Sequence, residues 1–211
     1  GPKDIIPPKL VRAMPADGSV YFTGGQVELI FSEYLKENSV DKSIRILPSL
    51  LEPPKIKYKG RALWVDFPDS LMENQTYIIS ISRDLRDEHG VQLSQGLQVA
   101  YATGAKIDQG QISGKIYYDK PAAVHLWKIK AENDLTQFYK TSPDYVTDAD
   151  DEGYYSFNYL SSGVYKLIGV NRSSAGLSLD PKRMIYGLSW KGNVQLDSVK
   201  IKDGINMRIA T

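Results

Sequence analysis

Short apolar runs separated by turn residues fill almost the whole sequence, and this spacing constrains the fold more than any other feature. Within most runs, apolar and polar side chains alternate, which is typical of a strand with one buried face. Gly, Asp and Asn fall between the runs at the spacing of about 8–12 residues that is found in sandwiches and barrels. The expected strands are residues 27–31, 43–49, 55–60, 62–68, 76–82, 98–104, 110–119, 122–130, 136–142, 153–160, 163–170, 193–201 and 205–211.

Helical patterns are confined to one short stretch, residues 33–40, and the polar residues 83–90 predict a loop. A parallel sheet needs long crossover connections, usually helices, between neighbouring strands. No stretch of this sequence supplies them, so we expect an all-β fold with antiparallel pairing. Residues 57–65 predict a hairpin through Lys59 and Gly60, because glycine adopts the positive φ of a tight turn without steric cost.

The polar, glycine-containing segment 102–111 separates the two sets of expected strands. A length of 211 residues fits two domains of about 100 residues each. The hydrophobic share of 42% is ordinary for globular domains that bury a core. We therefore expect two antiparallel β-sandwiches in tandem, residues 1–104 and residues 105–211.

Charge and cysteine content argue against several classes of protein. The 26 basic and 25 acidic residues are mixed along the chain and give a net charge of +1. Nucleic acid is therefore not expected as a partner, since phosphate binding needs a concentrated basic face. No apolar run approaches the length of about 20 residues that a membrane-spanning helix needs. Without cysteine, the chain has no disulfides, thiolate metal sites or cysteine nucleophiles.

The first half resembles the Ig-like domain of bacterial surface and envelope proteins, including surface-layer proteins. Residues 7–35 carry most of the resemblance, with Pro-Pro, a strand, Pro-x-Asp-Gly and an apolar strand ending in Phe-Ser-Glu. Further matching segments are residues 45–49, 71–82, 86–93 and 100–104. The resemblance covers nearly all of residues 5–104 and implies a sandwich there.

The opening residues 1–11 resemble the region just after the lipidated cysteine in envelope lipoproteins of Bacteroidetes-type bacteria. The cysteine itself would lie upstream of Gly1, and Gly1-Pro2 fits equally well a scar left by a tag-removing protease. The resemblance implies a lipid-anchored protein of the bacterial cell envelope, at the outer membrane or cell surface. Membrane association would come from this upstream anchor and not from the chain itself.

The second half is similar to the carboxypeptidase regulatory-like, or transthyretin-like, sandwich. The matching segments are residues 112–119, 122–129 and 147–170, which include the pattern Gly-x-Tyr-x-Phe-x-x-Leu. Domains of this family serve as scaffolding or adhesion modules, and their pattern carries no catalytic residues. The resemblance implies a transthyretin-like fold for residues 105–211.

Four acids, Asp148, Asp150, Asp151 and Glu152, precede Gly153. Carboxylate oxygens are the ligands that Ca²⁺ takes, so Asp148, Asp150 and Asp151 are a candidate calcium site. The ligand order of an EF-hand loop is absent, and acids beside a glycine also form solvated tight turns. The turn is the favoured interpretation, with calcium as the alternative and no other cofactor expected.

Aromatic residues of the second half supply the candidate contact surface. The long segment 171–191 departs from regular strand spacing and contains Tyr186 and Trp190. With Trp127, these residues are candidates for binding a protein partner or a glycan, because aromatic rings offer rigid, amphipathic contact area. Residues 83–90 are a second candidate contact loop.

Strand parity and the family pattern separate the remaining aromatic and histidine residues. The expected core face of residues 153–160 holds Tyr155, Phe157 and Leu160. His125 is expected to point to solvent on the same face as Trp127. His89 is expected in a solvated turn, with a weak metal contact as the alternative.

The sequence contains none of the motifs H-E-x-x-H, G-x-S-x-G, a P-loop or a dinucleotide-binding glycine fingerprint. We therefore predict a protein that is not an enzyme. A hydrolase stays an open alternative, because its two catalytic carboxylates can come from positions far apart in the sequence. The predicted function is a scaffold or binding module at the outer membrane that contacts an envelope protein, and a subunit of an outer-membrane assembly is a more specific form of this prediction. The alternative is a carbohydrate-binding or adhesion module of a larger secreted protein.

Overall fold

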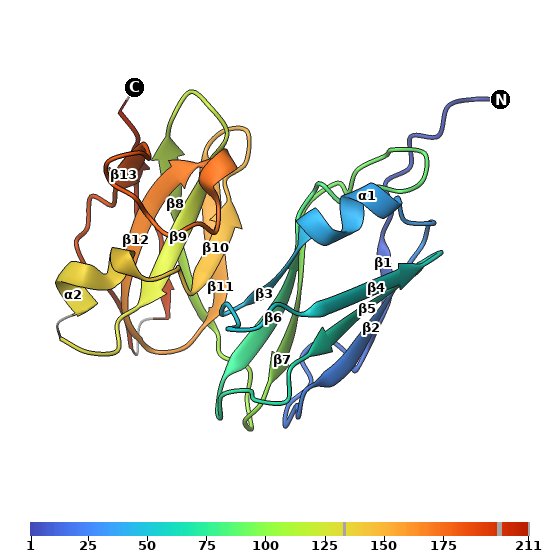
Figure 1. The fold of residues 1–211 in the computed structure, drawn as a ribbon, viewed down its shortest axis with the longest axis horizontal. Helices are drawn as coiled ribbons and strands as arrows, with labels where there is room; N and C mark the ends of the chain where they lie inside the picture. Colours follow the sequence, from blue (N-terminus) through green and yellow to red (C-terminus); the bar gives the residue numbers. More distant parts are fainter. Residues whose placement is uncertain (133, 198–199, 211) are drawn as a thin grey trace. The chain divides into compact units, whose positions relative to one another are not determined.

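The computed structural model describes residues 1–132, 134–197 and 200–210. Within these residues the chain forms two compact units, Gly1–Ile107 and Asp108–Thr211 (Figure 1). Both units consist almost entirely of β-strands, so the predicted all-β class is confirmed.

The first unit is a sandwich of two antiparallel sheets. The first sheet has the order β1-β2-β5-β4, and the second has the order β3-β6-β7. The elements of this unit are β1 (Leu10–Met14), β2 (Gly25–Phe31), α1 (Glu37–Val40), η1 (Asp41–Ser43), β3 (Ile44–Leu47), β4 (Lys55–Lys59), β5 (Ala62–Phe67), β6 (Thr76–Ile81) and β7 (Leu97–Ala102). The predicted β4–β5 hairpin is present, and Gly60 in its turn has a φ of 62°.

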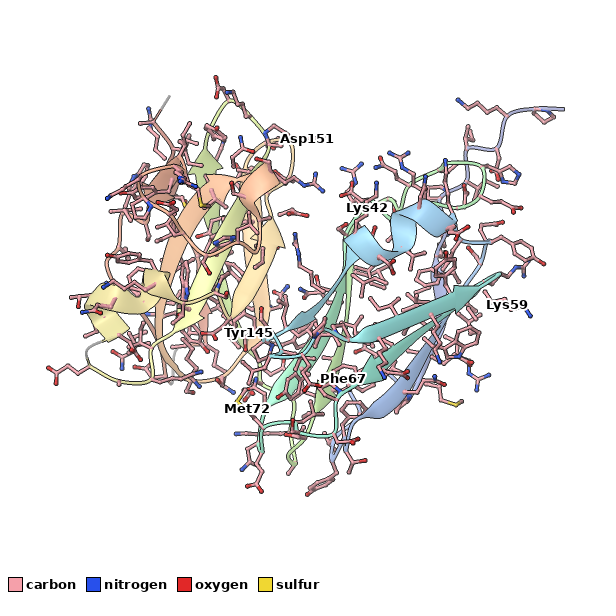
Figure 2. The ribbon with its side chains drawn as sticks, viewed as in Figure 1. Lys42, Lys59, Phe67, Met72, Tyr145 and Asp151 are labelled. Carbon is pink, nitrogen blue, oxygen red and sulfur yellow. The ribbon has the colours of Figure 1, made fainter. Side chains whose placement is uncertain are left out.

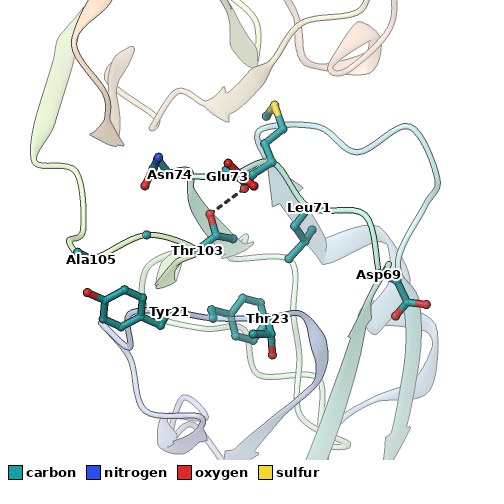
Figure 3. Close-up of a pocket in the computed structure, with 11 residues that line it drawn as sticks. Tyr21, Thr23, Asp69, Leu71, Glu73, Asn74, Thr103 and Ala105 are labelled. Carbon is teal, nitrogen blue, oxygen red and sulfur yellow. Dashed lines mark hydrogen bonds between the residues drawn. The ribbon is translucent and has the colours of Figure 1, made fainter.

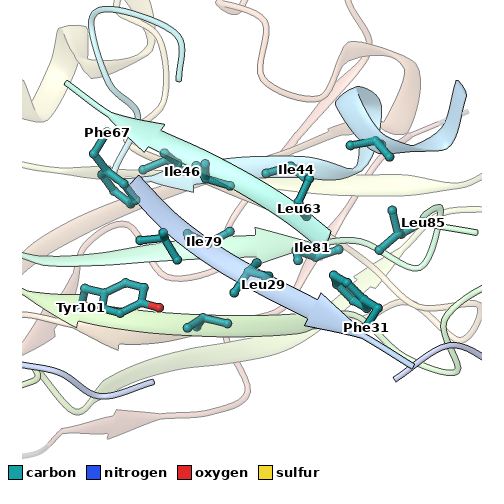
Figure 4. Close-up of a cluster of buried hydrophobic side chains, with 14 of the residues drawn as sticks. Leu29, Phe31, Ile44, Ile46, Leu63, Phe67, Ile79, Ile81, Leu85 and Tyr101 are labelled. Carbon is teal, nitrogen blue, oxygen red and sulfur yellow. The ribbon is translucent and has the colours of Figure 1, made fainter. Parts of the chain in front are cut away.

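Alternation along the strands of both sheets supplies the core of the first unit (Figure 4). Leu29 and Phe31 of β2 and Leu63 of β5 face Ile79 of β6 and Tyr101 of β7, and all five are buried. Each such side chain contributes about 1.5–3 kcal/mol when it leaves water. The sandwich therefore rests on the apolar face that the sequence predicts.

The helix expected over residues 33–40 is wrong in its first half. Only Glu37–Val40 is α-helical, followed by the 3₁₀ turn of Asp41–Ser43. Leu35 and Lys36 stay outside the helix because their backbone groups bond to other loops. The N–H of Leu35 donates to Gly60 at 2.9 Å, and the N–H of Lys36 donates to Arg86 at 2.9 Å.

The second unit is also built from two sheets. One has the order β10-β9-β12-β13, with β14 also pairing with β12, and the other has the order β11-β8-β15, with β16 also pairing with β8. The elements are β8 (Gly110–Tyr117), β9 (Ala122–Lys128), α2 (Asp134–Gln137), η2 (Phe138–Lys140), β10 (Tyr145–Asp148), β11 (Tyr154–Leu160), β12 (Gly163–Asn171), η3 (Arg172–Ser174), β13 (Tyr186–Leu188), β14 (Val194–Leu196), β15 (Ile201–Lys202) and β16 (Met207–Arg208). The short strands β15 and β16 pair with β8 in parallel, whereas the other pairs are antiparallel.

The inner faces of these two sheets pack on each other. A Cβ atom on Gly169 of β12 would lie 2.4 Å from the side chain of Ile116 of β8, so the sheets meet closely there. Parity correctly predicts the core face of β11, because three of its side chains are buried. These are Tyr155, Phe157 and Leu160.

The strand expected over residues 136–142 is wrong, because this segment forms α2 and η2 instead. Its rings pack onto the outer face of β9, where the Phe138 and Trp127 ring centroids lie 5.1 Å apart. On this edge β9 pairs with β10, of which only Asp148 was expected in the acidic turn. Phe138 and Tyr139 thus belong to a covering segment and not to a strand.

The expected exposure of His125 is also wrong. His125 does share a face of β9 with Trp127, but both are buried. The segment after β12 covers this outer face, and the backbone N–H of Gly176 donates to His125 Nε2 at 2.9 Å. The apolar residues of this outer layer are Ala123, Trp127, Ile168 and Val170, packed against Phe138, Tyr139, Ala175, Leu179 and Met184.

Candidate functional site

Exposed aromatic side chains gather with two cations on the outer face of the β11–β8 sheet. Trp190, Tyr154 and Tyr117 are 61%, 52% and 37% exposed. The Tyr117 and Trp190 rings stack with centroids 5.8 Å apart and planes 13° from parallel. We call Lys115, Tyr117, Tyr154, Trp190 and Arg208 the aromatic–cationic face.

The two cations lie against the rings. Lys115 Nζ lies 5.1 Å from the Tyr117 centroid and 5.0 Å from the Tyr154 centroid, between the two rings. The Arg208 guanidinium lies 5.5 Å from the Tyr117 centroid. Each exposed cation–π contact contributes about 0.5–1 kcal/mol, so the contacts order the side chains without burying them.

Strand register positions these residues. Lys115 and Tyr117 alternate along β8 with the buried Ile116, so they point outward together. Tyr154 of β11 is opposite Lys115, and Arg208 of β16 is paired with Tyr117. The face is therefore built on paired backbone rather than on a mobile loop.

Trp190 reaches this face from the turn after β13. Its backbone N–H donates to the carbonyl oxygen of Asn206 at 2.9 Å, and the preceding Ser189 forms a bridge with Met207. These contacts tie the turn to the segment that contains Arg208. The indole is thereby fixed against Tyr117 while most of its surface meets solvent.

The structure separates the three aromatic residues that the sequence analysis grouped. Trp127 is buried in the outer layer, and its Nε1 donates to the carbonyl oxygen of Thr141 at 3.1 Å. Tyr186 is partly exposed and pairs with Val170 on the other sheet. Only Trp190 belongs to the aromatic–cationic face, so these three do not form one platform.

Lys115, Tyr117, Tyr154 and Arg208 were not among the contact residues predicted from the sequence. Strand alternation could have predicted that two of these side chains point outward, because Tyr154 is next to the core residue Tyr155 and Tyr117 follows the buried Ile116. The contribution of Arg208 could not be predicted, because it depends on the parallel pairing of β16 with β8. No local pattern encodes that pairing.

The acids before Gly153 make structural contacts at a turn between the two sheets. Asp148 pairs with Arg172, at 3.4 Å between Oδ2 and Nη2. Asp150 Oδ1 accepts from the backbone N–H groups of Glu152 and Tyr154 at 3.0 and 2.8 Å. Asp151 is exposed at this turn (Figure 2). These contacts favour the turn, and calcium binding by Asp148, Asp150 and Asp151 stays a prediction.

The two predicted contact loops are partly used for packing. In residues 83–90, Leu85 and Asp87 are fully buried and only Glu88, His89 and Arg83 are classed as exposed. Segment 171–191 covers the outer layer with one side, while Leu177 and Ile185 on its other side are exposed. Neither segment is a freely projecting loop.

A shallow pocket of about 430 Å³ lies at one end of the first unit (Figure 3). Tyr21, Leu71 and Glu73 line it, together with Thr103, whose hydroxyl donates to the carbonyl oxygen of Met72 at 2.7 Å. The described lining residues include no histidine or lysine that would activate a hydroxyl as nucleophile. The pocket gives no catalytic assembly.

Comparison with known families gives one match, and it falls on the first unit. Residues 4–103 match the family model described as a bacterial Ig-like domain, so this part of the chain is similar to that family. No curated protein gives a significant match. The family match ends before the second unit, whose transthyretin-like assignment stays a prediction.

Solved structures show distant likeness only. The N-terminal part of the bacterial S-layer protein SbsC is 15% identical, with a TM-score of 0.34, and the match covers 94% of this chain but 45% of that one. Native alpha-2-macroglobulin from Escherichia coli, spanning domains MG0-NIE-MG1, is 11% identical with a TM-score of 0.34, covering 97% and 72%. The L,D-transpeptidase from Mycobacterium smegmatis is 11% identical with a TM-score of 0.33, covering 97% and 90%. Likeness this weak carries no functional argument.

Among the residues that the structure describes, no helix has the length and apolar character needed to span a bilayer.

Proposed function

We propose that this chain is a non-enzymatic binding module of the bacterial cell envelope. The bacterial Ig-like domain in residues 4–103 fits a cell-surface module. The observation that carries the proposal is the aromatic–cationic face of the second unit. Tryptophan, tyrosine and arginine are the residues most enriched at the energetic centres of protein interfaces, and here Tyr117 and Arg208 lie on paired strands with Trp190 stacked against Tyr117.

A protein partner fits this face better than a sugar. Sugar-binding platforms present open ring faces, whereas Tyr117 has Trp190, Lys115 and Arg208 against its ring. The cations favour a partner with acidic side chains, which would steer association and fix its orientation. Ordered side chains also reduce the entropy lost on binding.

The finer proposal is that the module is lipid-anchored and acts as a scaffold within an outer-membrane assembly. Its support is the resemblance of residues 1–11 to the region after a lipidated cysteine. Metabolic labelling of the native protein with an alkyne fatty acid tests the anchor. Absence of label on the protein, with label on a known lipoprotein of the same cells, would refute it.

Site-specific photocrosslinking in the native bacterium tests the binding face. A photoreactive amino acid replaces Trp190, and the control replaces Tyr34, a 50% exposed tyrosine of the first unit. We expect one defined crosslinked species from position 190 that the additional substitution Arg208→Ala weakens at least tenfold. Equal crosslinking from both positions, or none from position 190, would contradict the proposal.

Glycan binding is the second candidate, and it rests on the large open surface of the Trp190 indole. Titration of the purified chain with cell-wall and surface polysaccharides, followed by tryptophan fluorescence, tests it. A saturable change that is lost in Trp190→Phe would favour the glycan over the protein partner.

A further inference from the structure

Three potential metal ligands lie together on the Ig-like unit: Asp4, Asp87 and His89. One ligand atom from each lies within 4.8 Å of the other two. Among the residues that the structure describes, no other group of three or more His, Asp or Glu side chains meets this condition. The residues come from two distant parts of the chain, the N-terminal segment and the loop between β6 and β7.

Asp87 is the buried member of the cluster. Its side chain is fully buried, and Oδ1 accepts a hydrogen bond from the backbone N–H of Val91 at 2.9 Å. Its Oδ2 has no hydrogen-bond partner among the described residues. A buried carboxylate oxygen without a partner is costly, since the interior cannot replace the lost water. A cation at the cluster would supply the missing interaction.

The other two ligands already approach each other as ligands of one ion would. His89 Nδ1 lies 3.2 Å from Asp4 Oδ2. Two ligands of a tetrahedral zinc ion, with bonds of about 2.0–2.1 Å, lie about 3.3 Å apart. Asp4 and His89 have side chains that are 29% and 58% exposed, and Asp4 Oδ1 accepts from the backbone N–H of Ile6 at 3.0 Å, which leaves its Oδ2 to face His89.

We propose that Asp4, Asp87 and His89 form a zinc site. One imidazole nitrogen and two carboxylate oxygens suit Zn²⁺, whereas Ca²⁺ and Mg²⁺ prefer sets made of oxygen alone. The three side chains fill three positions of a tetrahedron, and water takes the fourth. The two carboxylates would balance the charge of the ion.

Zinc binding at this site would attach the N-terminal segment to the turn that contains Asp87. Residues 1–9 precede β1, and Ile5 and Ile6 within them are 76% and 63% exposed. Asp87 belongs to a turn that is well anchored, because its backbone N–H donates to Val91 at 3.0 Å and it forms a bridge with Leu35. Zinc bound by Asp4 would therefore join an exposed segment to a rigid part of the sandwich.

Isothermal titration of the chain with ZnCl₂ tests the site, using protein without a histidine tag because such tags bind zinc. We expect one zinc ion per chain, and at least tenfold weaker binding in Asp4→Asn and in His89→Ala. Both residues are partly exposed, so these variants are expected to fold. Asp151→Asn, which changes an exposed acid of the second unit, is the matched control and should bind as the parent does.

Limited trypsin digestion supplies a readout of the fastening itself. Zinc should slow cleavage after Lys3 severalfold in the parent chain and in Asp151→Asn, but not in Asp4→Asn. If about 1 mM Zn²⁺ gives neither a binding heat in the titration nor slower trypsin cleavage after Lys3, the proposal is overturned. Binding of equal strength in the parent, Asp4→Asn and His89→Ala would overturn it as well.

Discussion

The C-terminal segment of the second unit passes β8 at Gly114, and a methyl group at this position tests how tightly that segment is packed. A Cβ on Gly114 would lie 2.1 Å from the carbonyl oxygen of Ile205 and 2.5 Å from its carbonyl carbon. Because both are backbone atoms, no side-chain rotation relieves the clash. Gly114→Ala therefore has to displace the segment.

Hydrogen bonds around Ile205 determine how much Gly114→Ala lowers the free energy of unfolding. The N–H of Ile205 donates to Ser113 at 3.0 Å, and the N–H of Lys115 donates to the Asn206 side chain at 2.9 Å. The Tyr155 hydroxyl also donates to the carbonyl oxygen of Ile205. Weakening these bonds, at about 0.5–1.5 kcal/mol each, lowers the free energy of unfolding by about 3 kcal/mol. For a unit of this size, the Tm falls by roughly 12–24 °C.

Differential scanning calorimetry of the whole chain measures this effect. Only the transition of the second unit should shift, so the first unit serves as an internal reference. Gly176→Ala is the matched control, because a Cβ there meets no atom within 4 Å and the cost is only that of a positive φ, about 1–2 kcal/mol. If Gly114→Ala shifts the Tm no further than Gly176→Ala, the packing argument is wrong.

Three further predictions concern buried polar groups and the acidic turn. Burial raises the pKa of the Tyr165 hydroxyl from 10.0 to about 12. Its folded pKa exceeds the unfolded value, so about 2–3 kcal/mol of stability present below pH 10 should be lost between about pH 10 and pH 12. Urea unfolding across that range checks the loss, and a flat profile would contradict it. His125→Ala should cost about 2–4 kcal/mol by denaturation, because the Gly176 N–H loses its acceptor, whereas His125→Gln should recover part of the loss. Asp150→Ala should cost about 1–2 kcal/mol in the same assay, and an unchanged midpoint would show that the turn does not need its side chain.

Strand positions were largely predictable because alternation is a local property. Residues 62–68 and 76–82 alternate in the sequence, and the structure places β5 and β6 there. Residues 136–142 were also expected to form a strand, yet residues 136–140 lie in α2 and η2, and the adjacent rings of Phe138 and Tyr139 pack onto the outer face of β9. A short aromatic segment does not show whether its backbone pairs with a neighbouring strand.

Alternation along β9 did not predict that its outer face is buried. The parity of His125 and Trp127 was correct, but their exposure depends on a segment about 50 positions later in the chain, which brings Gly176 to His125. A strand covered on both faces reads as nearly continuous apolar sequence, as β9 does. The nearly continuous apolar sequence of residues 122–128 therefore indicated that both faces of this strand are buried, which the alternation of His125 and Trp127 did not show.

The location of the aromatic–cationic face follows from the same coverage. In the β10-β9-β12 sheet, η2 and segment 171–184 pack on the outer face, so rings such as Trp127 serve packing there. Tyr117 and Tyr154 on the outer face of β8 and β11 remain exposed, and only Trp190 reaches Tyr117 from a turn. Four of the five side chains of this face lie on β8, β11 and β16, where backbone pairing would have to break to move them. Binding by the proposed face should therefore depend on the identity of its side chains more than on loop rearrangement.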